Sequence, residues 1–148
     1  MSNLKKREYL LLPLDLCFFD RGRYDKMHSE RLPKIISYRK FPNELFRVHF
    51  ATKNIKGEDK QETHHLLWIQ VVEIQETSYV KFSCDCKYFK YRQIRPAKGL
   101  FGVQKIDNDL CVVVKPESFA QNERLFNIDK HAFLALQRLF NIQVQISI

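Results

Sequence analysis

Two cysteines separated by a single residue, Cys84 and Cys86, are the first candidates for chemistry in this sequence. Thiolates bind zinc, but a structural zinc ion takes four ligands. Cysteine pairs in zinc sites usually have two residues between them, whereas Cys84 and Cys86 have only one. The conceivable partners are Cys111, His64, His65 and His131. They include no second close pair, and a zinc-finger pattern that begins Cys-X-Cys continues with a Cys-X-His pair that is missing here. On a strand both thiols would share a face with Val80 and Phe82, as small core residues do. We therefore expect no metal and no cofactor.

Histidines form a second candidate group. His49, His64 and His65 could act as general bases beside Arg47, Lys60 and Glu62, a set that a metal-independent ribonuclease could use. The sequence has no glycine-rich phosphate loop, no paired-aspartate metal motif and no nucleophile elbow. We keep a small nuclease as an alternative and expect a protein that is not an enzyme.

The segment from Tyr79 to Phe101 mixes cations with aromatic rings. Single-stranded nucleic acid is bound by such mixtures, because cations follow the phosphates while aromatic faces stack on the bases. On a strand, Lys87, Phe89 and Tyr91 would share one face, and the alternate residues would share the other. The predicted binding residues are Lys87, Tyr88, Lys90, Tyr91, Arg92, Arg95 and Lys98. The alternative is a core strand whose rings point inward.

A second group of cations flanks a predicted hairpin in the N-terminal half. It consists of Lys34, Arg39, Lys40 and Arg47, for which we predict phosphate contacts. The formal net charge of +8 is concentrated, since residues 1–60 and 81–105 each carry +6. Clustered positive charge attracts polyanions, whereas evenly spread charge mainly aids solubility.

The elements that must position these residues are mostly strands. Alternating apolar residues predict strands at 35–40, 45–51, 65–76, 79–86, 100–106 and 110–115. Residues 65–76 and 110–114 are apolar on both faces, which is typical of interior strands.

The C-terminal part changes to a helical period. We predict a short helix at 118–126 and a second helix that begins after the capping residue Asp129 and runs to Phe140. Asn127 and Asn141 are interpreted as helix stops in the left-handed conformation. Residues 142–148 alternate again and predict a final strand. The predicted fold is a single α+β domain over 1–148, mainly antiparallel β, with seven or eight strands in a bent sheet or partly open barrel.

The remaining features concern location and partners. Four cysteines are too few for a disulfide scaffold. The apolar run at 9–19 is interrupted by Asp15 and lacks a cleavage site, so we expect no leader, no membrane segment and a reducing cytoplasmic location. The leading hypothesis is a module that binds RNA or single-stranded DNA within a nucleoprotein complex. The alternative is a protein-interaction or inhibitor module that docks on an acidic or nucleic-acid-binding partner.

Overall fold

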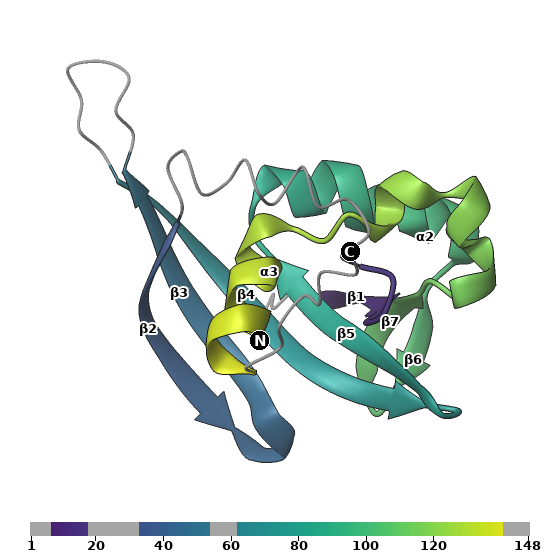
Figure 1. The fold of residues 1–148 in the computed structure, drawn as a ribbon, viewed down its shortest axis with the longest axis horizontal. Coiled ribbons are helices and arrows are strands. Elements are labelled where there is room, and N and C mark those ends of the chain that lie inside the picture. Colours follow the sequence, from purple (N-terminus) through teal and green to yellow (C-terminus); the bar gives the residue numbers. More distant parts are fainter. Residues whose placement is uncertain (1–6, 18–32, 54–61, 141–148) are drawn as a thin grey trace, which may run out of the picture.

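The computed structural model describes residues 7–17, 33–53 and 62–140. Within them, seven strands form one sheet in the order β2-β3-β4-β5-β1-β7-β6, shown in Figure 1. All neighbouring strands are antiparallel except β1 and β7, which are parallel. The strands are β1 (Glu8–Pro13), β2 (Lys34–Phe41), β3 (Leu45–Lys53), β4 (Glu62–Ile74), β5 (Thr77–Cys84), β6 (Gln104–Ile106) and β7 (Asp109–Val113).

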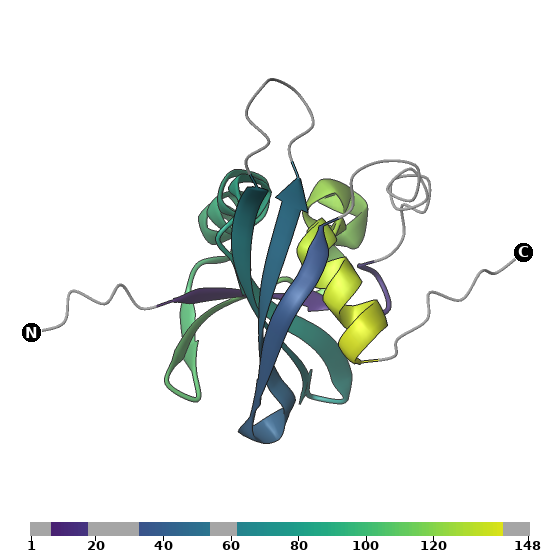
Figure 2. The same cartoon turned by 90° about the vertical axis from the view of Figure 1, so that its left-hand side faces the viewer.

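The two faces of the sheet are covered differently. On one face, alternate residues of β3 such as Phe46, Val48 and Phe50 join the main core, which also contains most of the helix α3 (Lys130–Leu139). Figure 2 shows α3 lying across the strands on this side. A smaller apolar cluster on the other face centres on Tyr9, Leu11, Tyr79, Cys111 and Val113. Each face of the sheet therefore carries an apolar cluster of its own.

Tight turns join β2 to β3, β4 to β5 and β6 to β7, although the chain has only four glycines. The turn residues with positive φ are Asn43 and Glu44, Gln75 and Glu76, and Asp107 and Asn108. Two consecutive residues of positive φ match the twist of the flanking strands. The predicted turns after β4 and β6 are therefore confirmed, with two residues each.

A helical segment spans residues 87–101. It includes 87–92, for which we expected a strand, and 100–101, which we expected to begin the strand at 100–106. A π-helix, η3 (Phe89–Ile94), continues into α2 (Arg95–Phe101). The buried residues of this segment are Phe89, Gln93, Ile94 and Ala97, and Phe89, Gln93 and Ala97 follow one another at intervals of four. The interpretation by alternation was wrong here because tertiary burial follows this helical period and not the period of two.

The C-terminal elements agree in part with the predictions. Asp129 is the N-cap of α3 and accepts a hydrogen bond from the backbone N–H of His131, as expected. The segment predicted as a helix at 118–126 consists of two 3₁₀ helices, η4 (Pro116–Gln121) and η5 (Glu123–Phe126). Asn127 follows η5 in an extended conformation (φ −70°, ψ 97°) and not in the left-handed one.

The architecture is α+β with a mostly antiparallel sheet that is not closed into a barrel, since β2 and β6 are its edges among the described residues. The interior positions predicted for β4 and β7 are confirmed. The predicted final strand at 142–148, like the helix stop at Asn141, lies outside the described residues. None of the described helices is long and apolar enough to cross a bilayer.

Candidate functional site

The cations predicted between 87 and 98 lie on the exposed side of η3 and α2. Lys87, Lys90, Arg92 and Arg95 are exposed, and none of the four forms an ion pair within the described residues. Lys98 differs, because its Nζ lies 2.7 Å from Oε2 of Glu8 on β1. In the helical segment the core-facing positions are apolar or Gln93, and all five cations are exposed.

The two tyrosines of this segment have different environments. Tyr91 is 58% exposed. Tyr88 is half-buried against the main core, and its hydroxyl donates to the carbonyl oxygen of Asn127 over 3.2 Å. Tyr91 is therefore the ring available for stacking, while Tyr88 ties η3 to the segment before α3.

A groove runs between η3 and the 3₁₀ helices η4 and η5, with a volume of about 980 Å³. Tyr88, Tyr91, Arg92 and Arg124 contribute to its walls together with small and polar residues, and Glu123 adds one acidic group. An uncovered ring and two guanidinium groups thus face the same open space.

The second predicted group lies on β2 and β3. Lys34, Arg39 and Lys40 are exposed, and Arg47 is half-buried. Arg39 stands opposite Arg47 in the strand register, and the Arg47 guanidinium lies 5.7 Å from the Trp68 ring centroid. The hairpin end of β2 and β3 and the helix η3–α2 lie at opposite ends of the molecule in Figures 1 and 2. Arg39, Lys40 and Arg47, in the half of the strands nearer the hairpin, therefore lie apart from the cations of η3 and α2, whereas Lys34 begins β2 at its other end.

The histidines line an open hollow of about 520 Å³, hereafter the histidine hollow. Nε2 of His49 lies 2.8 Å from Nδ1 of His64, and Nδ1 of His65 lies 2.9 Å from Oδ1 of Asp85. The other lining residues are Ser37, Tyr38, Arg39, Arg47 and Leu66. Lys60, which was also considered with this set, lies outside the described residues.

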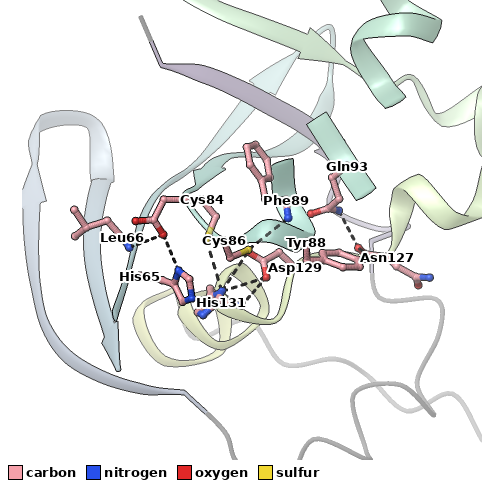
Figure 3. Close-up of polar contacts among 11 residues, drawn as sticks. His65, Leu66, Cys84, Cys86, Tyr88, Phe89, Gln93, Asn127, Asp129 and His131 are labelled. Atoms are coloured by element: carbon pink, nitrogen blue, oxygen red, sulfur yellow. Dashed lines mark hydrogen bonds and ion pairs between the residues drawn. The ribbon is translucent and has the colours of Figure 1, made fainter. Parts of the chain in front are cut away.

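The most concentrated group of reactive side chains is buried beneath this hollow. Cys84 ends β5, Cys86 follows two residues later, Asp129 caps α3 and His131 lies in its first turn. We call these four residues the buried cluster. One potential ligand atom from each lies within 4.8 Å of the others, and Figure 3 shows the side chains pointing toward one another.

The distances inside the buried cluster are short. Sγ of Cys84 lies 3.6 Å from Nδ1 of His131, and Sγ of Cys86 lies 3.2 Å from Oδ2 of Asp129. The same Oδ2 is 3.4 Å from Nδ1 of His131, while Oδ1 accepts from the backbone N–H of His131. Nδ1 of His131 is also 3.2 Å from Oδ1, so both carboxylate oxygens of Asp129 face the imidazole, while Oδ1 caps the helix and Oδ2 contacts the Cys86 sulfur.

All four side chains are almost completely removed from solvent, with exposed fractions of 4%, 5%, 0% and 0% in chain order. A hydrogen bond with Cys84 lowers the pKa of Cys86 to about 7 despite burial, whereas the same bond, together with burial, raises the pKa of Cys84. Burial opposes ionisation of Asp129 and His131, but their mutual hydrogen bond lowers the pKa of Asp129 and helps raise that of His131 to about 9. Cys86, Asp129 and His131 are therefore shifted toward their ionised forms in a dry interior, whereas Cys84 is held as a neutral thiol.

Two further contacts surround the cluster. The backbone N–H of Phe89 donates to Sγ of Cys86 over 3.4 Å. The ring of His65 lies 4.9 Å from the ring of His131, so His65 separates the buried cluster from the histidine hollow.

Sequence reasoning considered three of these four residues and missed the arrangement. His131 was considered as a ligand, but Asp129 was interpreted only as a helix cap. The signal that could have found the site is the matching separation of two potential ligands, Cys84-X-Cys86 and Asp129-X-His131. Searches with this chain matched no protein-family model, no curated protein and no solved structure.

Proposed function

We propose that this domain binds single-stranded nucleic acid, RNA or DNA, along the groove between η3 and the 3₁₀ helices. The observation that carries the proposal is the presence in one groove of an exposed tyrosine, Tyr91, and two arginines, Arg92 and Arg124. Bases stack on exposed aromatic faces whatever their identity, and arginines contact the connecting phosphates.

The surroundings of the groove add to its positive field. Lys87, Lys90 and Arg95 are exposed on the same helical segment and have no carboxylate partner within the described residues. Unpaired cations release more counterions on binding a polyanion than cations that must first leave a salt bridge. Lys98, paired with Glu8, is expected to contribute less than the others.

The β2–β3 cations have a secondary role in this proposal. Arg39 and Arg47 contact aromatic faces with their guanidinium groups, and they lie away from the groove. They would contact only the distant part of a long nucleic-acid chain, or a second nucleic-acid chain.

The test is fluorescence anisotropy with labelled mixed-sequence oligonucleotides of RNA and DNA at low and moderate salt. We expect Tyr91→Ala to weaken binding by roughly 10-fold or more, because one stacked base contributes about 1–3 kcal/mol. Arg92→Ala should lower the slope of log affinity against log salt by roughly one. Lys105→Ala, which removes an exposed cation on β6, is the control with the same change in charge.

Absence of binding to every oligonucleotide at low salt would refute this function. In that case, a complex with a protein partner that survives nuclease treatment would support the interaction or inhibitor module instead.

A second candidate function rests on the histidine hollow. His49 and His64 contact each other beside Arg47, and His65 is oriented by Asp85. A paired base and acid with a nearby guanidinium could cleave a phosphodiester bond. Wild type and a His49→Ala/His64→Ala variant should then differ in turnover of labelled RNA in the presence of a chelator. Equal turnover at the background level excludes this function.

A further inference from the structure

We infer that Cys84, Cys86, Asp129 and His131 form a tetrahedral Zn²⁺ site that fastens the end of β5 to the beginning of α3. The inference rests on the convergence of four potential ligand atoms from two distant segments, and it is independent of the proposed function. The first two ligands come from residues 84–86 and the other two from residues 129–131 (Figure 3).

The separations between the ligand atoms fit zinc. With bond lengths of about 2.3 Å to sulfur and about 2.0–2.2 Å to nitrogen or oxygen, tetrahedral coordination places neighbouring ligand atoms roughly 3.3–3.8 Å apart. The separations are 3.6 Å from the Cys84 sulfur to the His131 nitrogen, 3.2 Å from the Cys86 sulfur to the Asp129 oxygen, and 3.4 Å between that oxygen and that nitrogen. The other pairs of ligand atoms lie within 4.8 Å of each other, so the four side chains would draw closer together around a single ion.

The ligand types select the metal. Two thiolates exclude Mg²⁺ and Ca²⁺, which take oxygen ligands. A tetrahedral set of sulfur, nitrogen and oxygen is typical of Zn²⁺. All four positions are filled by protein and the site is shielded from solvent, so no position remains for a catalytic water. The centre is therefore structural.

Zinc binding would displace the protons that the metal-free cluster holds on Cys84 and His131, whose pKa values are both raised. With a neutral imidazole, two thiolates and one carboxylate carry a charge of −3, and burying this charge without compensation is very unfavourable. Zn²⁺ neutralises most of it. The backbone N–H of Phe89, which donates to Cys86, and the N-terminal end of α3 stabilise what remains.

The centre connects two segments that also form the groove walls. The Tyr88 hydroxyl and the Gln93 amide both donate to the Asn127 carbonyl, two residues before Asp129. A metal at this position holds η3 and the segment after η5 at a fixed distance. Loss of the metal should therefore loosen the groove as well as the start of α3.

The first experiment measures zinc in tag-free protein after dialysis against Zn²⁺ and then against buffer. We expect one zinc per chain by mass spectrometry. In competition with a chromophoric chelator, Cys84→Ser and Cys86→Ser should weaken zinc binding at least about 100-fold, because loss of a supporting contact alone costs about 10–100-fold. Cys111→Ser, another buried cysteine outside the cluster, is the matched control and should retain the metal.

Substitutions of Asp129 can separate its role as the helix cap from its role as a zinc ligand. Asparagine caps helices about as well as aspartate, so Asp129→Asn should leave α3 intact and weaken zinc binding. Asp129→Cys replaces the carboxylate by a thiolate and should retain one zinc. With Co²⁺ as the probe, the wild type should show the visible absorption of a tetrahedral thiolate site, and Cys86→Ser should lose intensity.

The competing explanation is a metal-free hydrogen-bonded network of the same four side chains. It predicts that the wild type binds neither Zn²⁺ nor Co²⁺, and this result would overturn the inference. If the cysteine variants fail to fold, the wild type alone decides. Removal of zinc by a strong chelator should lower its melting temperature and re-addition should restore it, whereas an unchanged melting temperature contradicts the site.

Discussion

The buried cluster and the histidine hollow contain similar side chains in very different surroundings. Both combine imidazole with carboxylate, and His65 contacts both regions, through the His131 ring on one side and Asp85 on the other. In the buried cluster, the four groups have exposed fractions of 5% or less, so each must find its partner inside the protein. In the hollow, the side chains of His64 and Asp85 are 48% and 50% exposed, so water can form hydrogen bonds with them. Burial, more than residue type, therefore decides which group holds the fold together and which is available to a ligand.

The largest expected difference is in stability. Cys86→Ser should lower the free energy of unfolding by about 3 kcal/mol or more, because it removes one ligand of the proposed zinc site and leaves the other buried charges poorly compensated. His64→Ala should change it by less than about 0.5 kcal/mol, as is usual at exposed positions. Urea denaturation of both variants in the presence of zinc measures the contrast. Equal losses would show that the two regions do not differ as described.

Cys17, a buried thiol outside the cluster, tests whether burial alone changes the pKa of a cysteine and the pH dependence of stability. Burial strongly raises the pKa of Cys17, from an ordinary value of 9.0, and the thiol donates to the Leu14 carbonyl over 3.3 Å. Above pH 9 the unfolded chain loses this proton and the folded chain keeps it. The stability contributed by Cys17 is therefore present below pH 9 and falls as the pH rises, by up to about 1.4 kcal/mol per unit.

Urea denaturation at several values between pH 8 and pH 10.5 measures this slope. Cys17→Ser retains a hydroxyl donor and should show a shallower decline than the wild type. Its zinc content should equal that of the wild type. A loss of zinc in this variant would mean that the cluster is not the only determinant of binding.

The smallest effect is expected at the border of the two regions. Asp85 lies between the two cysteines in sequence, but its side chain is half exposed and accepts hydrogen bonds from His65 and the backbone N–H of Leu66. Asp85→Ala should cost about 1 kcal/mol and leave the zinc stoichiometry unchanged. Zinc loss in Asp85→Ala would place Asp85 among the residues that hold the metal.

The elements that the sequence predicted correctly are those specified by residues close to one another in the chain. Alternation in β3 and β4, the two-residue turn at Asp107-Asn108 and the capping role of Asp129 each depend on neighbours within a few residues. These local signals gave the antiparallel character of the sheet and the start of α3.

The parts that were missed depend on distant contacts. Residues 87–98 contain both an alternating and a helical pattern, and only burial of Phe89, Gln93 and Ala97 selects the helix. The strand β1 lies in an apolar run whose partners are far along the chain. The buried cluster joins Cys86 to Asp129 across 43 positions, a separation that no motif of fixed spacing describes.

The position of β1 has a consequence for biosynthesis. Leu10 is aligned with Phe82 on one side and with Val112 on the other, so the strand is inserted between partners that are made much later. During translation, β1 cannot acquire both neighbours until Val113 has left the ribosome, and its buried leucines stay uncovered until then. Of the described strands, β1 is therefore synthesised first but is among the last to pair on both sides. The nascent chain is most vulnerable to aggregation before β7 emerges.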